Sequence, residues 1–198
     1  MRNTRKSLSW VKSKFESPAP SIVKQGVLRR WGGTQTWIET GTYLGETTRF
    51  LAKFSSTVIS IEPEKTLASK AAEYLKRYSN VRIVNGTSEE ILNSVLESLS
   101  ESQGKDVTFW LDGHFSEGFT FLADKECPLI DELEIIHRHI ANFQKTTILI
   151  DDVRELSPTG NIINGYPSLS YLVSWADSQR LAWTIEHDIF IMTNRVLH

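Results

Sequence analysis

Cysteine and long hydrophobic runs are nearly absent from this chain of 198 residues. Its single cysteine, Cys127, excludes an internal disulfide. No apolar run approaches the ~20 residues that a membrane-spanning helix needs, which excludes an integral membrane segment. The apolar and charged fractions, 40% and 23%, are those of an ordinary globular protein. The composition predicts one domain with a large core, in a reducing compartment that we expect to be the cytoplasm.

Acidic residues are also scarce in the first 35 positions, where Glu16 stands against eight Lys and Arg. Residues 1–35 therefore carry a net charge of +7, and the rest carries −9, since the chain totals −2. Leu8, Val11 and Phe15 form a narrow helical stripe. We interpret residues 1–35 as a basic helical extension packed on an acidic body. A lid over an anionic substrate and contact with lipid or nucleic acid are alternatives, and no dedicated RNA-binding motif supports the last.

Residues 36–198 alternate between buried-strand patterns and helical stripes, which predicts that they form the single folded domain, of α/β class. The predicted strands are Thr36–Thr40, Thr57–Glu62, Val81–Asn85, Asp106–Asp112 and Thr146–Asp151. Helical stripes separate them, and Trp183–Glu186 and Phe190–Thr193 then flank a hairpin turn. The prediction is a Rossmann-like, doubly wound, mostly parallel sheet of seven strands. It has an antiparallel C-terminal hairpin strand and helices on both faces.

The first of these strands runs into Glu39, followed by Gly41 and Gly45 and then by a helix. Glycine lets a main chain turn and approach a ligand closely, and the N-terminus of the helix points N–H groups at the same place. Glu62 ends the next strand, about 20 residues later, where a ribose hydroxyl is usually held. This pattern indicates a nucleoside-type cofactor site. The alternatives are a tight strand-to-helix turn for the glycines and a helix-dipole contact for Glu62.

Three more acids stand at the predicted ends of later strands: Asp112, Asp151 and Asp152. Ligands of an open parallel sheet bind beyond the carboxyl ends of its strands, so these side chains should meet. Crowded carboxylates repel one another unless a cation offsets them, and three aspartates suit a hard ion such as Mg²⁺. As an alternative, Asp112 caps a loop, and one of the other two caps the following turn.

These motifs together resemble those of a known family. The matching residues are Glu39-Thr40-Gly41-Thr42-Tyr43-Leu44-Gly45, Glu62, Gly86-Thr87-Ser88 and Asp112. This set resembles the class I S-adenosylmethionine-dependent methyltransferases. The runs Trp110-Leu111-Asp112-Gly113-His114 and Leu149-Ile150-Asp151-Asp152 are similar to those of the metal-dependent small-molecule O-methyltransferases, including the macrocin and catechol types. The resemblance covers residues 36–195.

The resemblance implies a cofactor site for S-adenosylmethionine. The positions matching the family's cofactor contacts are Glu39, Gly41, Thr42, Gly45, Glu62, Thr87, Ser88 and Asp112. Glu39 and the glycine turn would hold the methionine part, and Glu62 the ribose hydroxyls. Thr87 and Ser88 would lie beside the adenine. The chain departs from the family at Tyr43, often glycine, and at positions 87 and 88, one of which is commonly acidic.

The resemblance also implies a metal and a catalytic base. Asp112, Asp151 and Asp152 match the metal-ligand positions, with Mg²⁺ as the expected ion, although the catalytic site of the catechol type has an amide where Asp152 stands. His114, with Asp112, is the expected catalytic group, since histidine titrates near neutrality and can accept a proton. The aromatic loop Phe115–Phe121 and the segment Ser157–Pro167 are candidate walls of the substrate pocket. We expect an O-methyltransferase acting on a small hydroxylated molecule.

Two other functions share parts of this pattern. A nicotinamide-dependent oxidoreductase would use the same strand, turn and acid, but Gly41 and Gly45 lack the G-x-G-x-x-G spacing. That function also leaves the three aspartates without a role. A non-catalytic module that keeps the fold and binds the cofactor is the other alternative. The methyl acceptor and the oligomeric state, a homodimer included, stay open.

Overall fold

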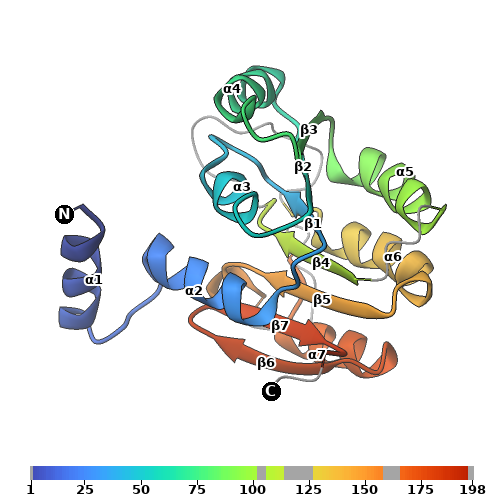
Figure 1. The fold of residues 1–198 in the computed structure, drawn as a ribbon. Coiled ribbons are helices and arrows are strands. Elements are labelled where there is room, and N and C mark those ends of the chain that lie inside the picture. The colour runs from blue at the N-terminus through green and yellow to red at the C-terminus, as the bar shows by residue number, and fades with distance from the viewer. Residues whose placement is uncertain (1, 102–105, 114–126, 158–165, 196–198) are drawn as a thin grey trace.

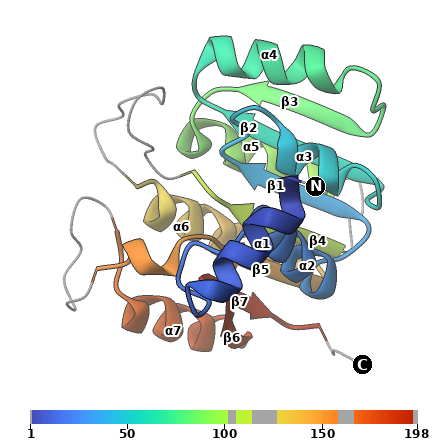
Figure 2. The same cartoon turned by 90° about the vertical axis from the view of Figure 1, so that its left-hand side faces the viewer.

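A seven-stranded sheet forms the centre of the protein in a computed structural model that describes residues 2–101, 106–113, 127–157 and 166–195 (Figure 1). The strand order is β3-β2-β1-β4-β5-β7-β6, with β3 and β6 at the edges (Figure 2). The strands are β1 Thr36–Thr40, β2 Thr57–Glu62, β3 Val81–Asn85, β4 Asp106–Leu111, β5 Lys145–Ile150, β6 Ala182–Glu186 and β7 Ile189–Thr193.

The first five strands pair in parallel, and β7 is antiparallel to both of its neighbours, β5 and β6. All five predicted strands are present with bounds within one residue of those expected, and the C-terminal hairpin is present as well. The expected α/β sheet of seven strands is therefore confirmed.

Helices cover both faces of the sheet (Figure 1). They are α1 Arg2–Lys12, α2 Ser21–Trp31, α3 Glu46–Leu51, α4 Lys65–Leu75, α5 Ser88–Glu101, α6 Leu129–His139 and α7 Leu169–Ser178, with 3₁₀ turns η1 Ile140–Asn142 and η2 Val153–Glu155. Side chains alternate along each strand, so neighbours enter different cores. Ile38 packs with α5, α6 and α7, whereas Trp37 packs with α2 and α3. Trp37 and Trp110 are fully buried core residues.

The two N-terminal helices are anchored differently. Val27 and Leu28 of α2 are buried in the core that contains Trp37. Helix α1 lies outermost, with α2 between it and the sheet (Figures 1 and 2). Its apolar residues Leu8 and Val11 are exposed. Among the described helices, none has the length and hydropathy to cross a membrane.

Candidate active site

The carboxyl ends of β1, β2, β4 and β5 bring the expected site residues to one rim of the sheet. Backbone pairing extends one residue past the strands: the N–H of Asp112 donates to the carbonyl of Thr40 at 3.1 Å. The N–H of Asp151 likewise donates to the carbonyl of Leu111 at 3.1 Å. This pairing fixes Asp112 between the glycine turn and Asp151. Acids that are far apart in the chain therefore share one edge, as the sequence predicts.

The glycine turn packs directly against the end of β4. Gly41 has a φ of +86° and donates its N–H to the carbonyl of Ile61 at 3.0 Å. A Cβ added at Gly41 would lie 2.4 Å from the carbonyl oxygen of Asp112. Gly45 has a φ of +76° and immediately precedes α3. Only glycine combines this backbone with this close approach, so the turn keeps the rim open beside Asp112.

Glu39 lies beneath the turn with 1% of its surface exposed. Its Oε2 accepts hydrogen bonds from the hydroxyls of Thr48 at 2.5 Å and Ser60 at 2.6 Å. The hydroxyl of Thr42 forms a hydrogen bond with the hydroxyl of Ser60 at 2.6 Å, which links the turn to this network. The other carboxyl oxygen, Oε1, is buried and has no hydrogen-bond partner. Burial raises the pKa of Glu39 to about 7, which makes it a group that a bound cation would ionise.

Glu62 is held in place by two backbone N–H groups. Tyr43 donates to its Oε2 at 2.8 Å, and Glu64 donates to its Oε1 at 3.0 Å. An ionised carboxylate has about four lone-pair sites, so Glu62 can still accept hydrogen bonds from a ligand. Gly86 donates its N–H to the carbonyl of Glu62 at 3.1 Å. That bond places Thr87 and Ser88, the first residue of α5, beside Glu62.

The three expected metal ligands lie together. Asp112, Asp151 and Asp152 each offer a carboxylate oxygen, and these oxygens lie within 4.8 Å of one another. Asp151 is 2% exposed, and its Oδ1 is buried without a hydrogen-bond partner. Burial raises the pKa of Asp112 well above its ordinary value, and the neighbouring charge of Asp151 adds to this effect.

Two basic residues that sequence analysis did not place in the site touch this aspartate trio. The Nζ of Lys24 forms an ion pair with Asp151 and lies 3.1 Å from Oδ1 of Asp152. The Nη1 of Arg154 lies 2.7 Å from the same Oδ1 and also pairs with Asp188. Burial acts to raise the pKa of Asp152, but hydrogen bonds and charge from Arg154 and Lys24 outweigh it and lower the pKa. Burial likewise raises the pKa of Asp151, to about 6, and Lys24 limits the rise.

A further acid that sequence analysis missed is Glu132, on α6. It is 1% exposed, and its Oε1 is buried without a partner on the side that faces Gly113. Burial raises the pKa of Glu132 to about 7, which hydroxyls of Ser88 and Thr40 offset only in part. A signal was available, because Glu132 falls on the helical stripe of Leu129, Leu133 and Ile136.

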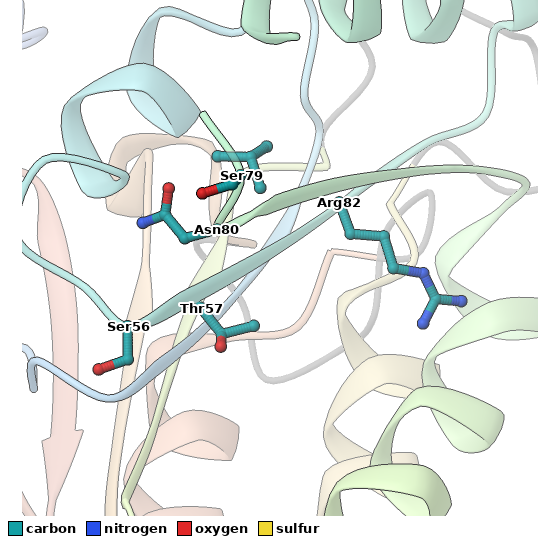
Figure 3. Close-up of a pocket in the computed structure, with 6 residues that line it drawn as sticks. Ser56, Thr57, Ser79, Asn80 and Arg82 are labelled. Atoms are coloured by element: carbon teal, nitrogen blue, oxygen red, sulfur yellow. The ribbon is translucent and has the colours of Figure 1, made fainter. Parts of the chain in front are cut away.

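Part of the expected site lies outside the described residues. This applies to His114, to the loop Phe115–Phe121 and to the central part of the segment Ser157–Pro167. A hollow of about 350 Å³ is found elsewhere, lined by Ser56, Thr57, Ser79, Asn80, Val81 and Arg82 (Figure 3). It lies at the starts of β2 and β3, the end of the sheet opposite to Glu62. The hollow is therefore separate from the rim of acids.

The buried acids Glu39 and Glu132 predict a fall in stability as pH rises. Each has a folded-state pKa of about 7 against an ordinary 4.5, so the folded protein keeps protons that the unfolded chain has lost. The stability that each contributes is complete below pH 4.5 and is lost through pH 7. Between pH 4.5 and pH 8, wild type should lose about 3 kcal/mol of unfolding free energy that Glu39→Gln keeps, as measured by denaturant titrations without ligand. The same difference in unfolding free energy between wild type and Glu39→Gln at both pH values would contradict this. Glu46→Gln, which replaces an exposed acid of α3, is the control.

Comparison with known proteins shows the fold. The sequence matches no protein-family model and no curated protein. An O-methyltransferase from Bacillus cereus, solved with SAH, superposes with a TM-score of 0.60 at 16% identity, covering 96% of this chain and 88% of that one. The O-methyltransferase TomG from Streptomyces achromogenes, involved in tomaymycin synthesis and solved with SAM, gives 0.57 at 15%, covering 96% and 87%. An rRNA methylase from Streptococcus thermophilus gives 0.50 at 13%, covering 90% and 96%.

These structures share the fold of this chain at low sequence identity. The protein therefore has the fold of the class I S-adenosylmethionine-dependent methyltransferases, as the resemblance implied. The substrates of these neighbours differ, since two are O-methyltransferases and one is an rRNA methylase. The likeness fixes the architecture, and the function must be argued from the residues of the rim.

Proposed function

We propose that this protein is an S-adenosylmethionine-dependent methyltransferase that methylates an oxygen of a small hydroxylated molecule with the help of a divalent ion. One observation carries the proposal: Glu39, the Gly41–Gly45 turn and Glu62 lie on the same rim as the aspartate trio. The SAH and SAM present in two structural neighbours agree with it.

The chemistry of the rim fits the cofactor. S-adenosylmethionine carries an ammonium and a sulfonium, and the unpartnered, buried Oε1 of Glu39 is a suitable acceptor for such a cationic group. Glu62, already oriented by Tyr43 and Glu64, would accept the ribose hydroxyls. Ser88 would lie beside the adenine. When bound, the cofactor supplies an activated methyl group, so the protein has to position an oxygen nucleophile and remove its proton.

The aspartate trio fits a hard divalent ion. Its oxygens are grouped within 4.8 Å, and Asp151 has a buried oxygen with no partner. Asp112, Asp151 and Asp152 would hold Mg²⁺, and the ion would supply the Lewis acidity that makes a hydroxyl acceptor easier to deprotonate. His114, two positions after Asp112, is the proposed proton acceptor. Residues 1–35 are proposed as an extension of the catalytic domain 36–198, with α2 contributing Lys24 to the rim.

The proposal is tested by calorimetric titration with S-adenosylmethionine, followed by methyl-transfer assays on a panel of phenols, sugars and aglycones. We expect the cofactor to bind, chelation by EDTA to abolish turnover, and Asp112→Asn to lower turnover at least about 100-fold with the fold intact. Asp177→Asn, an exposed site on α7, is the matched control and should keep full turnover.

The outcomes separate the parts of the proposal. No heat at millimolar cofactor would overturn the methyltransferase assignment. Binding of reduced nicotinamide in a fluorescence titration would favour the oxidoreductase instead. Turnover that survives both EDTA and Asp112→Asn would leave a methyltransferase that needs no metal. Cofactor binding without turnover on any acceptor would favour the non-catalytic module.

A further inference from the structure

Lys24 of α2 occupies a place in the aspartate trio that the proposed metal would use. Its Nζ pairs with Asp151, 127 positions away in the chain, and also contacts Asp152. The Lys24 side chain is 20% exposed and Asp151 is 2% exposed, so the pair is largely removed from water. Burial acts to lower the pKa of Lys24, but Asp151 and Asp152 outweigh it and raise the pKa. The ammonium therefore stays charged at this position.

The other basic group at the trio, Arg154, is shared with acids outside it. Arg154 pairs with Asp152 and with Asp188 of the β6–β7 turn, and its Nε lies 3.3 Å from Glu155. Among the described residues, Lys24 is the cation that pairs with Asp151. Three carboxylates and two cations leave the group with a net negative charge when all are ionised. A second partner for the orphaned Oδ1 of Asp151 is thus still missing.

We propose that Lys24 is the built-in counter-ion of the aspartate trio and that it competes with a divalent cation for Asp151 and Asp152. A divalent ion would take these carboxylates only as the Lys24 ammonium leaves them. This inference rests on the cation site of the proposed function and adds a regulatory contact to it. The N-terminal extension, through α2, would then set the cation concentration at which the site fills.

The structure allows Lys24 to leave while α2 stays docked. The buried residues of α2 are Val27 and Leu28, one turn further along the helix. Ser21 and Ile22, at its start, are exposed. A lysine ammonium is attached through four flexible methylene groups, so side-chain rotation can move it from the trio into solvent without moving the helix. The competition then involves a side-chain rotation, and a doubly charged ion wins at sufficient concentration.

The test is a Mn²⁺ titration followed by electron paramagnetic resonance, with the cofactor absent. Lys24→Met should bind Mn²⁺ about tenfold more tightly than wild type, a change within the usual range for coupled ligands. Lys24→Arg, which keeps the charge, should bind no more tightly than wild type. Lys145→Met is the matched control: it removes an exposed lysine at the start of β5, the strand that leads into Asp151, and should leave Mn²⁺ affinity unchanged.

A second readout covers a loss of stability. Without metal, Lys24→Met should melt below wild type because it leaves buried carboxylates without their cation, and Mn²⁺ should raise its melting temperature more than that of wild type. If Lys24→Met fails to fold, Lys24→Gln carries the same comparison. Equal Mn²⁺ affinity in wild type and either neutral variant would overturn the competition, and so would an absence of Mn²⁺ binding in all of them.

Failure of this inference can be told apart from failure of the proposed function. Calorimetry with S-adenosylmethionine on the same samples tests the methyltransferase assignment on its own. Cofactor binding with no gain in Mn²⁺ affinity in Lys24→Met would contradict the competition between Lys24 and the cation but leave the methyltransferase assignment standing. A gain in Mn²⁺ affinity without cofactor binding would support the competition and overturn the methyltransferase.

Discussion

Glu62→Gln is expected to weaken S-adenosylmethionine binding about 100-fold in calorimetric titrations. Two hydrogen bonds from the ribose to an ionised carboxylate are worth about 3 kcal/mol together, which corresponds to that factor. The amide that replaces the carboxylate also turns an N–H toward Tyr43 or Glu64, whose own N–H groups now point at Glu62. The substitution therefore removes a ligand contact and disturbs the turn that carries Gly41.

Glu64→Gln provides a closely matched control. Glu64 also accepts two backbone N–H groups, from Thr66 and Leu67, because it caps the N-terminus of α4. The same change of charge and loss of amide contacts occur two positions away from Glu62. We expect cofactor affinity within about twofold of wild type. If Glu62→Gln also stays within twofold while both variants fold, the ribose role of Glu62 is wrong.

Gly41→Ala is the second substitution with a large expected effect. The new Cβ would lie 2.4 Å from the carbonyl oxygen of Asp112, in backbone with a φ of +86° that alanine rarely adopts. The strain and the clash should together cost about 3 kcal/mol of unfolding free energy. Because the clash pushes Asp112 away from the turn, methyl transfer should fall further than stability alone explains. Denaturant titration and activity at saturating cofactor measure the two losses.

Gly26→Ala shows what the same substitution does where nothing opposes it. Gly26 lies inside α2, and a Cβ placed there would meet no atom within 4 Å apart from its chain neighbours and the backbone of its own helix. Alanine favours a helix over glycine, so stability should rise by up to about 1 kcal/mol. If Gly41→Ala changes the unfolding free energy by no more than Gly26→Ala does, the turn does not pack against Asp112 as the structure has it.

The strands and their ends were predictable because strands buried on both faces have a recognisable sequence pattern. A strand covered on both faces needs a continuous apolar run, so the first acid after it marks the carboxyl end. Glu39, Glu62, Asp112 and Asp151 follow this rule, and parallel pairing then brings them to one edge. The rim of acids could therefore be inferred without knowing the packing of the helices.

The partners of these acids could not be inferred in the same way. Lys24 meets Asp151 across 127 positions, and nothing in the local pattern of α2 distinguishes it from a solvent-exposed lysine. The contact depends on how α2 docks through Val27 and Leu28. Arg154 contacts both Asp152 and Asp188, and it lies in the turn after β5, where Asp152 has a φ of +57°. Glu132 lies on the buried stripe of α6 with Leu133 and Ile136, but no motif in the sequence links a single acid on such a stripe to the rim.

The account centres on where the cofactor binds, and a crystal structure with S-adenosylhomocysteine and Mg²⁺ tests that most directly. The prediction is density for the nucleoside against Gly41–Gly45, with the ribose hydroxyls on Glu62 and the amino-acid part reaching Glu39. An ion on Asp112, Asp151 and Asp152 should coincide with a Lys24 side chain turned away from them. A nucleoside bound at the hollow beside Arg82, or elsewhere than this rim, would contradict the account.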